Sequence, residues 1–237
     1  MSLQLFKFDQ ELPNAPVQGI IGVDEAGRGC LAGPVFAAAV YYPPQGLQKS
    51  TPPHDLAGVK DSKLLSPANR CRLFETLCQS RPERDSPTFA IASASVHEIA
   101  VLDILGATCL AMKRAIHALA QLCQLEIPHQ QQGQEPPCFN HTTSGPLIMI
   151  DGPTLKRLSI PHRGIVSGDQ KSFTIALASI CAKVSRDLEM MRLDQLHPDY
   201  GFRIHKGYAT KTHREKILQY GPSENHRAKF LRKLRPA

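Results

Sequence analysis

The stretch VQGIIGVDEAGRGCLAGPVFAAAVYYP, residues 17–43, places an apolar run on each side of a short polar loop that is rich in glycine. The first run, VQGIIGVDE, is typical of a β-strand that enters a site. The second, GPVFAAAVYYP, predicts a strand that is covered on both faces. Two carboxylates, Asp24 and Glu25, stand side by side between the runs. Because like charges repel and a buried carboxylate needs positive compensation, this strand end predicts a bound cation.

Three further strands are predicted along the chain. The run TFAIASASV, residues 88–96, predicts the third strand. PLIMIDGP, residues 146–153, predicts a short strand that ends in Asp151, and GIVSGDQK, residues 164–171, predicts another that ends near Asp169. Each run is apolar, short and bounded by turn-forming residues, which is typical of strands in a covered sheet.

Helical patterns separate these strands. Ser66 is expected to cap a helix that begins at Pro67. Residues 97–122 have helical periodicity, with Gly106 as the expected weak point. Residues 171–193 predict a strong helix whose apolar stripe has a polar neighbour formed by Ser172, Ser179, Lys183 and Arg186. Strands interleaved with helices indicate an α/β fold.

A chain of 237 residues suits one large domain with an appendage. We predict a catalytic domain over residues 1–195 and a basic, helical C-terminal segment over residues 196–237. Residues 124–146 are rich in Gln, Pro, Gly, Ser and Thr, which predicts a flexible insertion within the first domain. His129 and His141 in this insertion are expected to be solvated, since no spaced partner supports metal binding.

Composition points to a cytoplasmic protein that does not contact a membrane. No apolar run reaches the length of a membrane span, and the N-terminus lacks the apolar core of a secretory signal. The seven cysteines are scattered and form no CxxC motif, so we expect reduced thiols that serve as small core residues.

The positive charge of the chain is concentrated in its C-terminal part. From Arg203 to Ala237, ten Lys and Arg stand against two Glu, so this segment carries +8 while the whole chain carries +7. Such a basic face favours binding to polyanions. The alternative is a solvated helix face, because charge runs often serve only solubility.

Four acids lie at or just beyond the ends of apolar runs: Asp24, Glu25, Asp151 and Asp169. Strand ends that meet at one sheet edge form the usual site of an open α/β sheet. An all-carboxylate set favours Mg²⁺ or Mn²⁺ over Zn²⁺, and two such ions would suit phosphodiester hydrolysis. Alternatively, Asp151 is a turn residue and Asp169 a helix cap. Joint use of Asp24 and Glu25 requires a twist or bulge, since neighbours on a strand face opposite ways.

The loop Gly27-Arg28-Gly29 follows the acid pair directly. Glycines allow a ligand to approach the backbone closely. Amides of such a loop can donate to phosphate or sugar hydroxyls, and the arginine can hold a phosphate. Together with the carboxylates, the loop therefore points to a nucleic-acid backbone as the ligand.

The combination of motifs resembles the bacterial ribonuclease HII family over nearly the whole chain. The resemblance is carried, in order, by GVDEAGRG (22–29), LAGPV (31–35), DSKLLS (61–66), LIMIDG (147–152), SGDQKSFTIALASICAKVSRD (167–187), YGFRIHKGYAT (200–210) and GPSENHRAKF (221–230). It implies an RNase H-like mixed five-stranded sheet flanked by helices, with a C-terminal helical appendage.

The resemblance also implies an activity. A relative of this family would cleave the RNA strand of RNA–DNA hybrids and cut 5′ of a single ribonucleotide embedded in duplex DNA. Hydrolysis would use two Mn²⁺ or Mg²⁺ ions and leave 3′-hydroxyl and 5′-phosphate ends. The 2′-hydroxyl is the group that separates the two sugars, so a close backbone loop is a sensible reader of it.

The same resemblance assigns roles to residues. It implies that the metal-site and catalytic acids are Asp24, Glu25, Asp151 and Asp169. It implies that the loop reading the 2′-hydroxyl is Gly27, Arg28 and Gly29. Tyr208 matches the tyrosine that stacks on the deoxyribose after the ribonucleotide, and Lys63 and Lys183 are expected to contact the substrate.

Two positions depart from the family pattern. Cys30 stands where proline is common, and Leu64 where a second lysine is common, which leaves Lys63 to hold a phosphate. Other readings are ribonuclease HIII, a junction resolvase, or a catalytically silent nucleic-acid-binding module. No C-terminal Gln-x-x-hydrophobic-x-x-aromatic-aromatic motif is visible, so we do not predict sliding-clamp binding. We expect the protein to be a monomer.

Overall fold

The computed structural model describes residues 2–12, 18–79, 85–127 and 145–232. Five strands form one sheet in the order β3-β2-β1-β4-β5. The strands are β1 (Ile20–Ala26), β2 (Val35–Tyr42), β3 (Thr88–Ala94), β4 (Leu147–Asp151) and β5 (Arg163–Ile165). β1, β2 and β3 are antiparallel neighbours, whereas β4 runs parallel to β1 and β5 parallel to β4. The predicted mixed sheet is confirmed.

Helices cover both faces of this sheet. The α-helices are α1 (Ser2–Gln10), α2 (Pro44–Leu47), α3 (Pro67–Gln79), α4 (Val96–Cys123), α5 (Phe173–Leu196), α6 (Phe202–His205) and α7 (Lys211–Tyr220). Short 3₁₀ turns are η1 (His54–Leu56), η2 (Ser62–Leu64), η3 (Gly168–Gln170), η4 (Pro198–Tyr200) and η5 (Ala228–Phe230). Among the described residues, no helix is long and apolar enough to cross a membrane.

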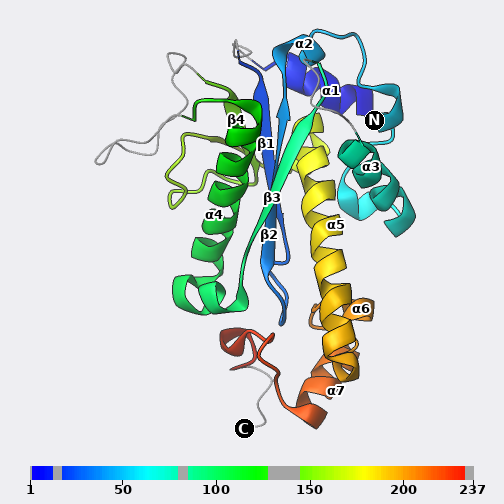
Figure 1. Cartoon of the computed structure of the whole chain (residues 1–237), viewed down its shortest axis with the longest axis vertical. Helices are drawn as coiled ribbons and strands as arrows, with labels where there is room; N and C mark the ends of the chain where they lie inside the picture. Colours follow the sequence, from blue (N-terminus) through cyan, green and yellow to red (C-terminus); the bar gives the residue numbers. More distant parts are fainter. Residues whose placement is uncertain (1, 13–17, 80–84, 128–144, 233–237) are drawn as a thin grey trace.

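The sheet separates two apolar cores. α4 lies on one face, and α5 with α1 and α3 lies on the other (Figure 1). Ile20 belongs to the core under α5 and Ile21 to the core under α4, so β1 is buried on both sides. A Cβ at Gly22 would stand 2.5 Å from the carbonyl carbon of Thr174, so the glycine lets α5 pack directly on the centre of β1.

The start of α3 follows the sequence, whereas the interruption of α4 does not. α3 begins at Pro67, and the Asn69 N–H donates to Ser66 Oγ at 3.3 Å, which confirms the cap. In α4 the expected weak point at Gly106 is wrong, because the non-helical residue is Asp103 with φ 62°. The Gly106 N–H donates to Asp103 Oδ1 at 2.9 Å, so this side chain restarts the helix as an N-cap would.

Residues before α5 also differ from expectation. β5 ends at Ile165, and Asp169 lies in the separate turn η3 rather than at a strand end. The cap of α5 is Ser172, whose Oγ accepts from the Ile175 N–H at 3.2 Å, so Asp169 is free for another role. Residues 128–144 of the predicted insertion lie outside the described residues.

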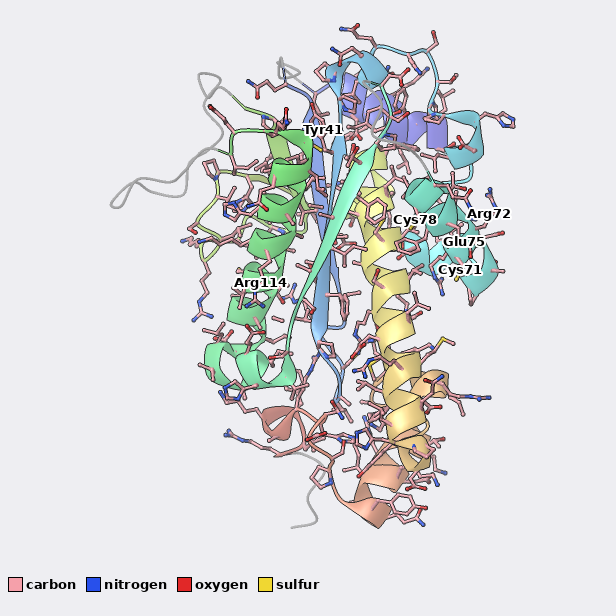
Figure 2. All side chains as sticks on the ribbon, viewed as in Figure 1. Tyr41, Cys71, Arg72, Glu75, Cys78 and Arg114 are labelled. Carbon is pink, nitrogen blue, oxygen red and sulfur yellow. The ribbon has the colours of Figure 1, made fainter. Side chains whose placement is uncertain are left out.

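Two cysteines are not the core residues that the sequence suggested. Cys71 and Cys78 are exposed on α3 (Figure 2). Cys30, Cys109 and Cys181 are buried, as expected. The described cysteines are free thiols. The buried residues of α3 are Leu73 and Leu77, which lie one helical turn apart on the same face. Cys71 and Cys78 lie outside that buried face.

The C-terminal helices pack at the far end of α5 (Figure 1). From there the chain returns to the loop after β1. Ala32 pairs with His226, and the Gly33 N–H donates to the Asn225 carbonyl at 2.8 Å. The C-terminal segment therefore supports the loop that carries Gly27, Arg28 and Gly29.

Candidate active site

Three of the four predicted acids meet at one edge of the sheet. β1 and β4 are parallel neighbours with Val23 opposite Ile150, so Asp24 and Asp151 follow at adjacent positions. Asp169 reaches them from η3. One carboxylate oxygen from each of these residues lies within 4.8 Å of the others. This separation suits shared ligation of cations by carboxylates.

Backbone hydrogen bonds hold these carboxylates in place. Asp151 Oδ1 accepts from the Gly168 N–H at 2.6 Å, which ties η3 to the end of β4. Asp24 Oδ1 accepts from the Glu25 N–H at 2.6 Å. Lys63 Nζ lies 3.3 Å from Asp169 Oδ2 and is mostly exposed. The acids are thus oriented before any ligand arrives.

Electrostatics show that the cluster is short of positive charge. The pKa of Asp24 is raised well above its ordinary range by burial, and the charges of Glu25 and Asp151 add to the effect. The pKa of Asp169 is raised by burial and by Asp151, with Lys63 opposing. A cation would relieve both the burial and the repulsion.

Glu25 lines the cavity beside these acids but is not one of the three clustered acids. Its Oε1 accepts from Arg28 Nη1 at 3.0 Å, and the pair forms a salt bridge. Burial raises the pKa of Glu25, and Arg28 partly offsets the rise. Arg28 therefore holds a candidate ligand in place, in addition to its predicted role toward phosphate.

A cavity of about 240 Å³ lies beside the acids. Eight of the ten predicted site residues line it: Asp24, Glu25, Gly27, Arg28, Lys63, Asp151, Lys183 and Tyr208. Asp169 and Gly29 are not part of this lining. Ser62 and Ser179 also line the cavity, and their hydroxyl oxygens lie 2.9 Å apart. Neither was among the site residues predicted from the sequence. The polar stripe on residues 171–193 was the available signal for Ser179.

The two loop glycines have different structural needs. Gly27 has φ 97°, and a Cβ there would collide with the buried side chain of Arg186. At Gly29 a Cβ would meet no described atom within 4 Å. Gly27 is therefore required by the fold, whereas Gly29 leaves open space in front of the loop.

Two buried arginines support this loop from beneath. Arg186 donates to the carbonyls of Ala32 and Pro34, and Arg227 donates to those of Arg28 and Gly33. Both guanidinium groups are buried. Sequence analysis counted Arg227 among the polyanion-binding charges of the tail, which is wrong, because its side chain is occupied inside the protein.

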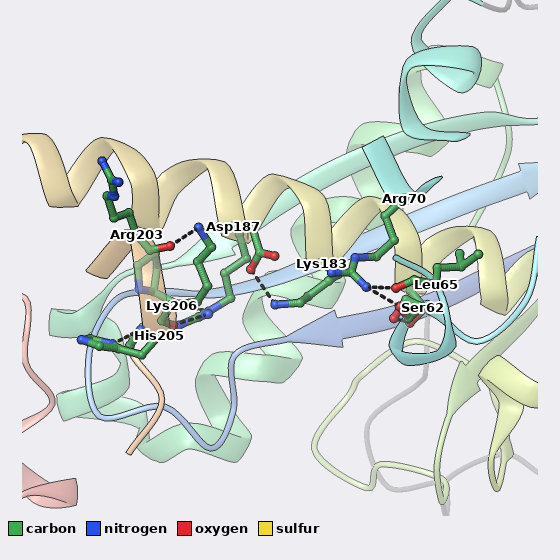
Figure 3. A network of polar contacts seen from close by, with 12 residues as sticks. Ser62, Leu65, Arg70, Lys183, Asp187, Arg203, His205 and Lys206 are labelled. Atoms are coloured by element: carbon green, nitrogen blue, oxygen red, sulfur yellow. Dashed lines mark hydrogen bonds and ion pairs between the residues drawn. The ribbon is translucent and has the colours of Figure 1, made fainter. Parts of the chain in front are cut away.

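Lys183 and Tyr208 lie together at the cavity. Lys183 Nζ donates to Asp187 Oδ1 at 2.6 Å (Figure 3), so Asp187 is an ion-pair partner as well as a surface charge. The same Nζ lies 5.6 Å from the centre of the Tyr208 ring. Arg70 Nη1 donates to the Ser62 and Leu65 carbonyls and fixes η2, which carries Lys63 (Figure 3).

Comparison with known proteins adds independent findings. The profile of the family Ribonuclease HII matches residues 21–233. Ribonuclease HII of Caldicellulosiruptor saccharolyticus is 38% identical over 97% of this chain and 95% of its own length. Ribonuclease HII of Neisseria meningitidis serogroup C is 42% identical over 88% of this chain and 90% of its own length.

Solved structures share the fold. Ribonuclease H2 of Pyrococcus horikoshii has a TM-score of 0.63 at 23% identity, covering 91% of this chain and 96% of its own. The RNase HII in the PCNA complex from Archaeoglobus fulgidus has a TM-score of 0.62 at 22% identity, covering 92% and 97%. The mixed five-stranded sheet with flanking helices is therefore RNase H-like.

Proposed function

The chain belongs to the ribonuclease HII family, and we propose that Asp24, Glu25, Asp151 and Asp169 form the catalytic centre of this endonuclease. The family is metal-dependent and acts on RNA–DNA hybrids. The single observation that carries the assignment is the approach of three carboxylates within 4.8 Å beside the Gly27–Gly29 loop. Asp24 and Asp169 are buried there, and Asp151 is half-buried.

The donor set fits a hard divalent cation. All three clustered ligands are carboxylate oxygens, and burial leaves them without enough positive charge. Mn²⁺ or Mg²⁺ would be held by Asp24, Asp151 and Asp169, with Glu25 available after release from Arg28. When bound, such ions supply an acidified water and neutralise charge at the leaving oxygen. Bst-RNase HIII, a fold relative with a TM-score of 0.61 at 19% identity, was solved with Mn²⁺.

The chain's own residues would position the scissile bond. Arg28, Lys63 and Lys183 are the cavity's cationic groups and suit the phosphates on either side. Water adds to phosphorus and the 3′ oxygen leaves, so the products carry a 3′-hydroxyl and a 5′-phosphate. Lys63 Nζ lies 3.3 Å from Asp169 Oδ2, so its ammonium group would contact both a bound phosphate and the acid cluster.

Selectivity for ribose would come from the loop and Tyr208. The open space at Gly29 allows a sugar hydroxyl to reach the loop backbone. Tyr208 lies at the cavity with 41% of its surface exposed, so its ring can pack against the following deoxyribose. This arrangement supports cleavage 5′ of a single ribonucleotide in duplex DNA.

Regions outside the cavity would supply general affinity. We propose that residues 1–195 form the catalytic domain and that the basic segment 196–237 contacts phosphates through exposed side chains such as Arg203, Lys211 and Arg214. The protein is proposed to act in the cytoplasm as a monomer. The Archaeoglobus fulgidus relative was solved with PCNA, so a pull-down with a sliding clamp tests the expectation that this chain lacks that partner.

The test is cleavage of three duplexes in Mn²⁺: an RNA–DNA hybrid, DNA with one ribonucleotide, and all-DNA. We expect cleavage of the first two, a product with a 5′-phosphate on the ribonucleotide, and an intact all-DNA duplex. Cleavage of the hybrid alone would contradict the proposed reading of a single ribose by Gly27–Gly29 and Tyr208. Asp151→Asn is the test variant, because it removes one of the three clustered carboxylates. Asp55→Asn, which neutralises an exposed acid in η1, is its matched control.

A further inference from the structure

The C-terminal segment contains a buried cluster of imidazoles. His205, His213 and His226 are each less than a tenth exposed. The rings of His205 and His213 stack with centroids 4.0 Å apart, and those of His213 and His226 are 5.2 Å apart. Nothing in the proposed catalysis uses these three side chains.

Hydrogen bonds determine which nitrogen of each ring carries the proton. The Ser223 backbone N–H donates to His226 Nδ1 at 2.9 Å, so the hydrogen of a neutral His226 is on Nε2. That N–H points at His213 Nε2, 3.1 Å away, which must accept. The hydrogen of His213 is therefore on Nδ1, and it donates to the Tyr208 carbonyl at 2.8 Å.

The backbone of the third histidine, His205, binds the other side of Tyr208. His205 Nδ1 accepts from the Gly207 N–H at 3.2 Å, so its hydrogen is on Nε2 and donates to the Tyr200 carbonyl at 2.9 Å. The Tyr208 N–H donates to the His205 carbonyl at 2.9 Å. The backbone of Tyr208 is thus bound at both its N–H and its carbonyl by residues of the cluster.

These bonds matter because the Tyr208 side chain is partly exposed beside the cavity. Tyr208 is 41% exposed, its ring centre lies 5.6 Å from the cationic groups of Lys183 and Arg186, and its side chain also contacts Cys30. Lys183 is itself paired with Asp187. The position of the ring in the cavity therefore depends in part on the backbone anchor beneath it.

We propose that His226 and His213 are positioning residues that aim Tyr208 at the nucleic-acid sugar through a chain of two neutral imidazoles. The inference rests on the proposed function, because it takes Tyr208 as the residue that contacts the deoxyribose after a ribonucleotide. The chain runs from the Ser223 backbone through both rings to the Tyr208 carbonyl. A second proton on either ring would place two donors face to face, so the chain works only when both rings are neutral.

The test compares two substitutions at His213. His213→Phe keeps the stacked ring and removes both hydrogen bonds. His213→Asn keeps a donor near the position of Nδ1 and removes only the link to His226. The measured quantity is the cleavage rate at a single embedded ribonucleotide divided by the rate within a long RNA run. Ile116→Val, a core truncation in α4 under the opposite face of the sheet, controls for lost stability alone.

We expect the ratio to fall on the order of 10-fold in His213→Phe, since a misplacement of about 1 Å can cost on the order of 100-fold in rate. It should stay within about twofold of the parent in His213→Asn and in Ile116→Val. Tyr208→Ala must lower the ratio as well. If Tyr208→Ala lowers it and His213→Phe does not, the positioning role is refuted while the proposed function stands. An unchanged ratio in Tyr208→Ala refutes both the positioning role and the assignment of Tyr208 to sugar recognition, and leaves ribose selectivity to the Gly27–Gly29 loop.

Nitrogen-15 NMR of the imidazoles tests directly the proton positions on which the proposal depends. In the parent we expect the Nδ1–H tautomer for His213 and the Nε2–H tautomer for His226. In His213→Asn the tautomer of His226 should remain Nε2–H, because the Ser223 N–H still occupies its Nδ1. The opposite tautomer of either ring in the parent would overturn the proposal whatever the cleavage ratio.

Discussion

Replacing Asp24 by Asn should remove activity and stabilise the metal-free protein. Asn keeps an oxygen that can accept from the Glu25 N–H, now 2.6 Å from Asp24 Oδ1, so the end of β1 should keep its shape. The substitution removes one of three carboxylates that repel each other. It also removes a cation ligand, so cleavage should fall on the order of 1000-fold.

The size of the stabilisation follows from the separation of the charges. Two unit charges 4.8 Å apart repel by roughly 3.5 kcal/mol at an effective dielectric constant of about 20. Burial raises the pKa of Asp24 and so disfavours its charged form in the parent, which makes the full repulsion an upper bound. The expected gain in the free energy of unfolding is therefore about 1–3 kcal/mol, or roughly 2–12 °C in melting temperature for a chain of this size.

Thermal melting in EDTA and in Mn²⁺ measures both effects. In EDTA Asp24→Asn should melt higher than the parent, and Asp55→Asn should melt close to it. In Mn²⁺ the parent should gain stability and Asp24→Asn should gain much less, because binding to the folded state alone stabilises it. A variant that melts lower than the parent in EDTA would refute the account of a strained acidic cluster.

Three further predictions follow from other parts of the structure. Gly27→Ala should lower the free energy of unfolding by more than about 1 kcal/mol, because φ is 97° and Arg186 fills the space, whereas Gly29→Ala should leave melting unchanged and slow cleavage. Joint replacement of Lys211 and Arg214 by Gln should reduce the salt dependence of hybrid binding by about 1–2 in log–log slope, and an unchanged slope would mean that these side chains face away from the substrate. Burial lowers the pKa of His213 to about 4. An unfolded histidine titrates near about 6.5, so the unfolded state binds a proton more readily than the folded state. His213 alone should therefore lower the free energy of unfolding by up to about 3 kcal/mol as pH drops from about 6.5 to 4. Denaturant melts across this range should show a weaker dependence of the free energy of unfolding on pH in His213→Phe than in the parent.

The parts of the fold that sequence could predict are those determined by local pattern. β1 and β2 are apolar runs in the sequence, which predicts the two strands. Ser66 followed by Pro67 is a local capping signal, which predicts the start of α3. The meeting of Asp24 and Asp151 was also expected, because each lies at or near the end of an apolar run; in the structure Asp151 ends β4, whereas β1 continues past Asp24 to Ala26. Their adjacency depends on β4 lying parallel to β1, which is a tertiary choice that no local signal specifies.

What sequence could not predict depends on distant contacts. Gly106 has the lowest helix propensity in α4, yet the helix breaks at Asp103, whose carboxylate caps the next turn and pairs with Arg157. Arg227 counts as a tail charge in composition but donates to the loop after β1. The histidine cluster is not predicted by the sequence, because its members are dispersed along the chain and meet only when α6, α7 and residues 223–227 pack together.

The most direct test of the catalytic centre is an anomalous difference map from crystals of the protein grown with Mn²⁺. The account predicts a Mn²⁺ peak coordinated by oxygens of Asp24, Asp151 and Asp169, with loss of that peak in Asp24→Asn crystals prepared identically. A peak held by other residues, or the same peak retained in Asp24→Asn, would contradict the assignment of these carboxylates as the metal site.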